Sequence, residues 1–286
     1  MKYLKFITGI LIILFKTGNV LSNNNIFNVN NVEINKEIYN NKEKLVDQAF
    51  TRAFDQLLNR VLLKEDYKKF SSVGLSEIKE LILYYQIINP EESDETNLIK
   101  INVFFDKEKM HNFFNTKNVL YSDIINTEVI LFPLLKKNEK YFIYTKNYFY
   151  NNWNKDDNDE LIQYILPSEN IESIQVINEY KDNIFKIDVT NFFKEYEIEN
   201  VVFLNLDVKE ENAKIFINTR IEGKKINKNL IIKNKNKLSE ENFNKQIILE
   251  LNDIITDLIK SQNLIDVKTP SFLNVAIKIN NKKSNL

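Results

Sequence analysis

Apolar side chains recur every fourth residue between Leu45 and Leu62, in the stretch LVDQAFTRAFDQLLNRVL, and form two adjoining rows. This spacing predicts a long helix with a broad apolar stripe along one side. Ala49 and Ala53 lie within that stripe, where a small side chain lets a helix lie close to a sheet. Because such a stripe must be buried against another layer, we expect a sheet beside this helix.

The flanking sequence supplies the strands of that sheet and further helices. The alternation of apolar and polar residues over 26–38 is typical of a half-buried strand. The other expected elements are a second helix after Gly74 with Ser76 as its cap, strands over Tyr84–Ile88 and Leu98–Phe105, and a short helix from Asp106 that buries Met110, Phe113 and Phe114. This order predicts a small α+β domain with helices on one face of its sheet.

A second set of strands and helices follows from residue 121. The expected elements are a buried strand broken around Pro133, a charged turn at 136–140 with a return strand, a strand over Leu161–Leu166, a helical stretch over 187–198, a strand over 201–208, a hairpin turning at Gly223-Lys224, an amphipathic helix over 239–262, and a last strand over 271–279. We therefore expect an α+β protein of two small packed αβ subdomains, over 23–120 and 121–280, with mixed sheets, helices on one face, and a frayed tail over 281–286.

The amino terminus has the features of a secretory signal peptide. Lys2 and Lys5 precede an apolar run of about ten residues, whereas a membrane-spanning helix needs about 20. Val20 and Ser22 have the small side chains that signal peptidase requires, so we expect cleavage after Ser22 and a periplasmic mature protein. An uncleaved anchor, which would tether the protein to the membrane, is the alternative.

Composition excludes several kinds of site. The chain has no cysteine, so it forms neither disulfides nor thiolate metal sites, and its single histidine cannot build a zinc site of several imidazoles. Of four glycines, two lie within the first 22 residues, which leaves too few for a phosphate-binding loop. Loss of the three lysines in residues 1–22 takes the formal net charge from −1 to about −4, which argues against general nucleic-acid binding.

The order of these features resembles an uncharacterised family of proteobacterial exported proteins, known only as a domain of unknown function. Four segments carry the resemblance: QAFTRAFDQLLNRVL, INVFFDKEKMHNFF, ILFPLL and ILPSENIESI. The later stretch KEYEIENVVFLNLDV, with the hairpin after it, is similar to the αβ domain of curli-secretion-channel and Tol-translocation proteins. The resemblance implies a periplasmic location and transfers no functional residues.

Two polar segments are weak candidates for chemistry. His111 is expected on the exposed side of a short helix, without an evident nucleophile or orienting carboxylate. Residues Asn154 to Glu160 place oxygen ligands at alternate positions, as a calcium loop does, but Asp159 and Ile165 stand where glycine and a bidentate glutamate belong. We therefore expect a surface turn there, with no catalytic, metal or cofactor-binding residues in the chain.

Two surfaces remain as candidates for binding. The aromatic stretch from Tyr141 to Trp153 suits either the core or a partner-facing surface, for which the candidates are Tyr148, Tyr150 and Trp153. The hairpin lysines are candidates for contact with an anionic membrane surface or are a solvated strand face that prevents edge-to-edge aggregation; they are Lys224, Lys225, Lys228 and Lys233.

Together these features predict an exported, non-enzymatic interaction or scaffold module of the cell envelope, with other envelope proteins as partners. The alternative is a cofactor-free periplasmic hydrolase that uses a carboxylate pair near Asp156 to Glu160. The sequence leaves the oligomeric state open.

Overall fold

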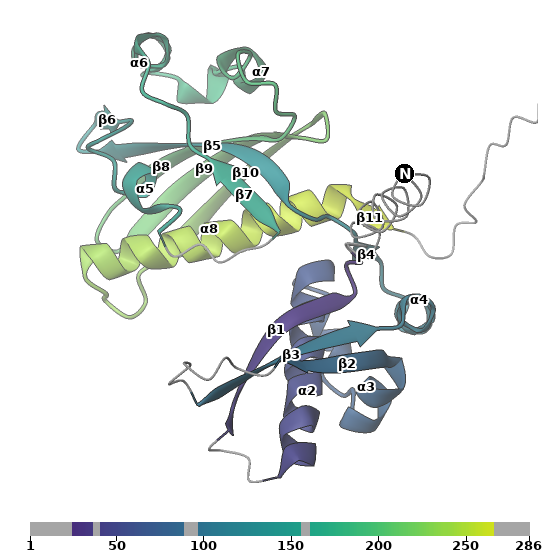
Figure 1. The fold of residues 1–286 in the computed structure, drawn as a ribbon. Helices are drawn as coiled ribbons and strands as arrows, with labels where there is room; N and C mark the ends of the chain where they lie inside the picture. Colours follow the sequence, from purple (N-terminus) through teal and green to yellow (C-terminus); the bar gives the residue numbers. More distant parts are fainter. Residues whose placement is uncertain (1–24, 37–40, 89–96, 156–160, 266–286) are drawn as a thin grey trace, which may run out of the picture.

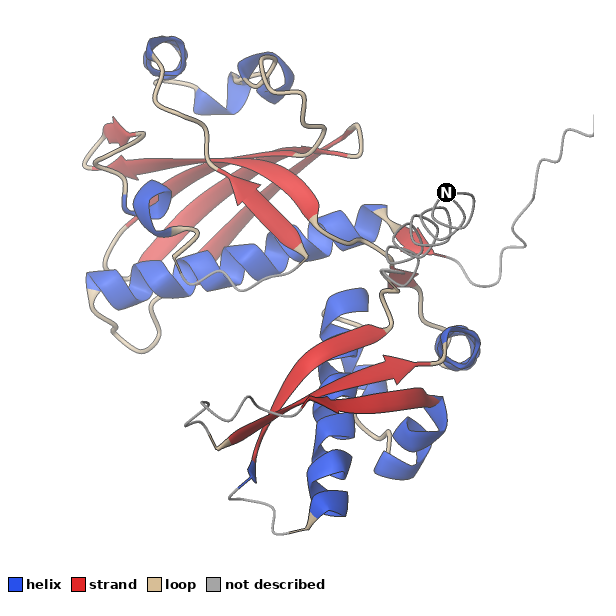
Figure 2. Cartoon of the chain, in the orientation of Figure 1, coloured by secondary structure: helices blue, strands red, loops and turns tan. Residues whose placement is uncertain are grey.

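The computed structural model describes residues 25–36, 41–88, 97–155 and 161–265. These residues form an α+β protein with three open sheets, as the sequence predicts (Figures 1 and 2). We call residues 25–120 the first unit, which surrounds one core, and residues 123–263 the second unit, which surrounds two cores, one on each face of its sheet. The expected signal peptide and the expected strand over 271–279 lie outside the described residues. None of the described helices is long and apolar enough to cross a membrane.

The first unit is an antiparallel sheet with helices on one face. Its strands follow the order β1-β3-β2: β1 (Asn28–Asn35), β3 (Leu98–Phe105) and β2 (Ile82–Ile88). The helices are α2 (Lys42–Val61), the 3-10 turn η3 (Tyr67–Phe70), α3 (Leu75–Leu81) and α4 (Lys107–Thr116). All four helices contribute side chains to one apolar core, which confirms the expected arrangement of this unit.

The predicted apolar stripe of α2 is buried along its whole length. Ala49 and Ala53 have no exposed surface, so the helix backbone lies close to the sheet. The Asn41 side chain accepts a hydrogen bond from Glu43 N and begins the helix, and Asp106 does the same for Lys109 N in α4, as predicted. The predicted cap of α3 is wrong: Ser76 lies inside the helix, which begins after Gly74 without a side-chain cap.

The second unit is built on a larger mixed sheet in the order β10-β9-β8-β5-β6, with β7 also paired to β5. Its strands are β5 (Thr127–Lys137), β6 (Lys140–Phe142), β7 (Ile162–Ile165), β8 (Val201–Val208), β9 (Asn212–Ile221) and β10 (Lys224–Lys233). Its helices are α5 (Tyr148–Asn152), α6 (Ile171–Glu179), the 3-10 turn η4 (Ile184–Lys186), α7 (Val189–Phe192) and α8 (Glu240–Gln262).

Helices cover both faces of the second sheet, whereas the sequence predicts them on one face. Alternate residues of β5 point to opposite sides: Val129 and Leu131 pack with α8, and Ile130 and Phe132 pack with α6 and α7. Figure 1 shows α8 along one face and α6 and α7 above the other. The seven residues from Val129 to Leu135 are all buried, as is typical of a strand enclosed by two layers.

Strand β5 continues through Pro133, where the sequence predicts a break. Ile130 donates its backbone N–H to Asn200 O on the side of β8, so Pro133, three residues later, faces the other edge of β5. There β7 pairs only with residues 127–130 and β6 only with 135–137. The N–H that proline lacks therefore falls in the gap between β6 and β7, where no ladder bond is lost.

The side chain of Asn147 makes hydrogen bonds beside the gap between β6 and β7. Its side chain has no exposed surface, and Oδ1 accepts a bond of 3.0 Å from Phe149 N at the start of α5. Its Nδ2 lies within hydrogen-bond distance of three backbone carbonyl oxygens, those of Pro133 (2.7 Å), Phe142 (2.9 Å) and Ile143 (3.2 Å). One amide thus joins β5, β6 and α5.

We expect Asn147→Ala to lower the free energy of unfolding by about 2–4 kcal/mol, because it leaves buried carbonyl and N–H groups without partners. Urea titration followed by the fluorescence of Trp153, the only tryptophan, measures this loss. Asn151→Ala is the matched control, since the exposed Asn151 donates a single bond to Thr145 O, and it should cost less than about 1 kcal/mol. Equal losses in the two variants would contradict the role given to Asn147.

Candidate functional site

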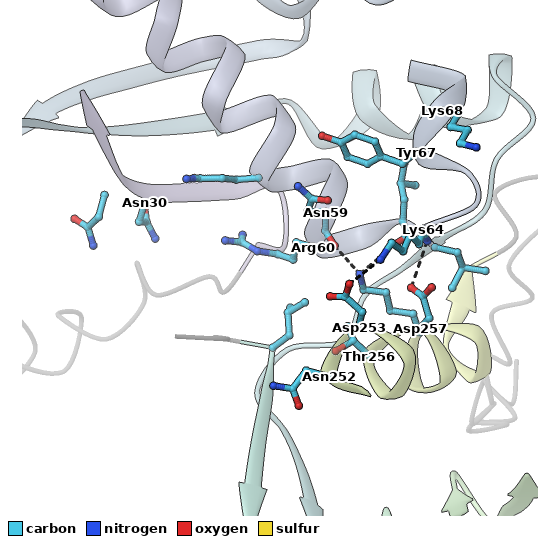
Figure 3. A pocket seen from close by; sticks show the side chains of 16 residues that line it. Asn30, Asn59, Arg60, Lys64, Tyr67, Lys68, Asn252, Asp253, Thr256 and Asp257 are labelled. Atoms are coloured by element: carbon cyan, nitrogen blue, oxygen red, sulfur yellow. Dashed lines mark hydrogen bonds and ion pairs between the residues drawn. The ribbon is translucent and has the colours of Figure 1, made fainter. Parts of the chain in front are cut away.

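A cleft lies where the end of α2 meets α8 of the second unit, and it has a volume of about 760 Å³. Its walls carry mainly polar and charged side chains (Figure 3). Nearby, strands β4 (Tyr121–Ser122) and β11 (Leu264–Ile265) form a short antiparallel ladder between the two units. The cleft therefore lies at the junction of the units.

Lys260 is the centre of this junction. It extends from α8, is only 3% exposed, and donates from Nζ to the backbone oxygens of Asn59 (2.5 Å) and Leu62 (3.1 Å). The last carbonyl groups of a helix have no partners within the helix and carry its negative partial charge. An ammonium group of the second unit thus caps the carboxyl end of the main helix of the first unit.

A second lysine, from the first unit, bonds to the second unit. Lys64 of the first unit donates from Nζ to Asp253 Oδ2 at 2.7 Å, and its backbone N–H lies 3.3 Å from Asp257 Oδ1 (Figure 3). The hydrogen bond and the negative charge of Asp253 raise the pKa of Lys64. Both groups are exposed, so this pair adds little stability.

Arg60 anchors the other side of the cleft. It donates to the backbone oxygens of Asn28 (2.6 Å) and Ile26 (3.3 Å), which lie in and before β1. The three basic groups Arg60, Lys64 and Lys260 therefore bond to protein oxygens. The contacts of Lys64 and Lys260 hold the two units together, whereas Arg60 joins α2 to β1 within the first unit.

His111 is half-buried, whereas the sequence predicts an exposed position. Its Nε2 lies 2.8 Å from the hydroxyl oxygen of Tyr121, and its ring packs edge-on against Phe27. Burial lowers the pKa of His111, the charge of Lys107 lowers it further, and Glu108 opposes both. Burial also raises the pKa of Tyr121 to about 12. The neutral pair therefore links α4 to β4 and serves the fold.

The aromatic stretch divides between core and surface. Trp153, predicted as a partner-facing candidate, is 1% exposed and packs in the core between the sheet and α8, which corrects that prediction. Tyr148 and Tyr150 are half-buried, and the Tyr150 hydroxyl donates to Pro167 O at 2.7 Å. The stretch forms β6 and α5, so the helical period takes Trp153 inward.

The four hairpin lysines are exposed on β10, but they do not form one surface. Lys224 and Lys228 point to the face that carries α8, because Lys228 pairs with the inward-facing Ile217. Lys225 and Lys233 point to the opposite face, and Lys225 lies 3.4 Å from Asp188. A flat anionic membrane would therefore meet two of these lysines at a time.

The expected acidic turn is described only in part. Asn154 is exposed and donates from Nδ2 to Tyr164 O, while residues 156–160, the site of the alternative hydrolase hypothesis, lie outside the described residues. Within the described ranges, no group of three or more histidine or carboxylate side chains is placed to hold a metal ion.

Comparison of the chain with models of known families, with curated proteins and with solved structures gives no match. The resemblance to an exported family therefore stays a prediction.

The role of the junction lysine is not evident from the sequence. The four-residue row of α8 that ends at Lys260 also contains Asn252 and Thr256, so it is typical of a solvated helix face. Its acceptors, the backbone oxygens of Asn59 and Leu62, lie 201 and 198 residues earlier in the chain and are not encoded locally.

We expect Lys260→Met to lower the free energy of unfolding by about 1–3 kcal/mol, because two buried carbonyl groups lose their donor while the side-chain volume is kept. Chemical denaturation followed by circular dichroism measures the change. Lys245→Met, on the exposed side of the same helix, should stay within about 0.5 kcal/mol of wild type. A neutral Lys260→Met would show that the cap does not stabilise the junction.

Acidification should destabilise the protein through His111. Because its folded pKa lies below the unfolded value of 6.5, the unfolded chain takes up the proton first. The stability that the protein gains from keeping His111 neutral is fully present above about pH 6.5 and is lost as the pH falls below that value. We expect His111→Gln to show a smaller loss of stability than wild type between about pH 7.5 and about pH 5.5. Parallel curves for the two proteins would contradict this assignment.

Proposed function

We propose that this chain is an exported protein of the cell envelope that acts as a non-enzymatic interaction module, with strand β2 as its partner-binding surface. One observation carries the proposal: β2 exposes four large apolar side chains on a single seven-residue strand. They are Leu83 (61% exposed), Tyr84 (47%), Tyr85 (42%) and Ile88 (38%). Apolar surface gathered in this way is typical of protein interfaces, in which tyrosine is enriched.

The β2 surface is ordered before any partner binds. The ring of Tyr84 stacks on Phe104 with centroids 4.3 Å apart and an angle of 13° between the planes. The ring of Tyr85 packs edge-on against Phe50 of α2, on the other side of the sheet. Rings held in this way lose little conformational entropy on binding, which favours association.

The junction cleft supports an interaction protein rather than an enzyme. Among its basic side chains, Lys64 and Lys260 bond between the two units, and Arg60 bonds to backbone oxygens of the first unit. His111 bonds to a tyrosine hydroxyl within the first unit. These contacts give each group a structural role, and none of them activates a nucleophile.

The envelope location is supported by the amino-terminal sequence. The basic residues, the short apolar run and the small residues before Asn23 match the three parts of a signal peptide. The resemblance to an exported protein family supports the same location.

Site-specific photo-crosslinking in intact cells tests the proposal. A photoreactive residue at Leu83 should give a crosslinked band in the envelope fraction, whereas the same residue at Lys228 on β10 should give none, because lysine-rich edges repel partner strands. Mass spectrometry of the purified protein should find Asn23 as the amino-terminal residue. A cytosolic protein that retains Met1, or crosslinking that is equal at the two positions, would overturn the proposal.

A further inference from the structure

The first sheet has two edges, and one of them is blocked. On β1, successive backbone groups point alternately to β3 and to the free edge, where the carbonyls of Asn28 and Glu33 lie. Arg60 donates to Asn28 O at 2.6 Å, and Arg52 donates to Glu33 O at 2.7 Å. These two guanidinium groups occupy acceptors that an added strand would need, so β1 is closed to pairing.

The other edge, β2, is open along its described length. Phe105 of β3 donates its backbone N–H to Phe27 O, on the side of β1. Because backbone groups alternate in direction along a strand, the odd-numbered residues of β3 bond toward β1 and the even-numbered residues bond to β2. Their partners are Tyr84, Gln86 and Ile88. The backbone N–H and C=O groups of Tyr85 and Ile87 therefore point away from the sheet, and no hydrogen bond within the described residues uses them.

The edge strands β2 and β10 differ in charge. The outer strand of the second sheet, β10, carries four lysines in ten residues, an arrangement that prevents edge-to-edge pairing. The sequence of β2, ILYYQII, contains no charged residue. An uncharged, apolar and open edge is the part of a sheet that accepts another strand.

We propose that the strand that pairs with β2 is β2 of a second copy of this chain, related by a twofold axis. The sequence of β2 is close to a palindrome about Tyr85. Strand β2 pairs regularly with β3 over residues 84–88, and its register shifts between Ile82 and Tyr84. In the antiparallel pairing centred on Tyr85, Tyr84 faces Gln86 of the other copy, Tyr85 faces itself, and Ile87 lies opposite the irregular segment that contains Leu83. Apolar residues thus meet apolar residues, and no like charges are opposed.

Backbone geometry favours the same register. In an antiparallel pair, residues whose N–H and C=O groups point to the partner alternate with residues that bond elsewhere. The backbone N–H and C=O groups of Tyr85 point to the free edge. Two copies paired at this residue therefore form two hydrogen bonds, from the Tyr85 N–H of each copy to the Tyr85 C=O of the other. Tyr84 and Gln86 then form the closely spaced pair on the outer face, beside the stacked ring of Phe104. The two three-stranded sheets become one six-stranded sheet.

This inference rests on the proposed function, since it names the partner at the same surface. Light scattering of the purified mature protein should give twice the mass of one chain. Leu83→Lys should raise the dissociation constant of the dimer about tenfold or more, because it places an ammonium group on the apolar edge that the two copies share. Ile231→Lys is the matched control: this residue is 59% exposed on β10, and the same change there should leave the mass unchanged.

Cysteine crosslinking tests the register without relying on dissociation. The chain has no cysteine, so each introduced thiol is unique. A Tyr84→Cys chain mixed with a Gln86→Cys chain should form an interchain disulfide, because closely spaced antiparallel pairs place their Cα atoms about 4.5 Å apart, within disulfide range. Tyr84→Cys mixed with Ile231→Cys should form none.

The outcomes distinguish the two proposals. A doubled mass that is lost in Leu83→Lys, together with the disulfide between positions 84 and 86, supports the symmetric dimer. A monomeric protein overturns it, whether the edge of β2 is then used by another protein or by residues 266–286 of the same chain. A dimer that is unaffected by Leu83→Lys also overturns it. Crosslinking of a monomer to a different envelope protein at Leu83 would keep the proposed function and remove the dimer.

Discussion

Strand β5 runs through the middle of the second sheet with helices above and below it, so its side chains from Val129 to Leu135 must all be accommodated inside the protein. This constraint requires an apolar strand and assigns alternate residues to two separate cores. It also fixes where proline is tolerated. Pro133 can lie in this strand because its nitrogen faces the gap between β6 and β7, and Asn147 supplies the donor that the gap lacks.

Local periodicity predicts most elements correctly because the pattern of one segment determines which of its faces is apolar. The stripe of α2, the strand pair β2 and β3, and the long helix α8 were each predicted from their own spacing. Local reasoning fails where a neighbouring segment decides the outcome. The break expected at Pro133 is absent because β8 holds the strand on its other edge, and Trp153 is buried because α8 lies opposite α5.

The contacts of the junction show why the candidate site could not be predicted. Lys260 and its acceptor Leu62 are separated by 198 residues, and His111 and Tyr121 come from different elements. Lys260 and His111, each taken alone, are typical of a solvated helix face. Only the packing of the two units makes one of them a helix cap, because a buried ammonium group needs acceptors that another segment has left unpaired.

Helix α2 links this junction to the blocked edge of the first sheet. Its arginines Arg52 and Arg60 close the edge of β1, and its last carbonyl groups accept from Lys260 of the second unit. The second unit is therefore held on the side of β1, while β2 lies two strand spacings away, about 10 Å across the sheet. A strand added to β2 extends the sheet away from the junction (Figure 1). Self-association through β2 therefore leaves the contacts between the two units intact.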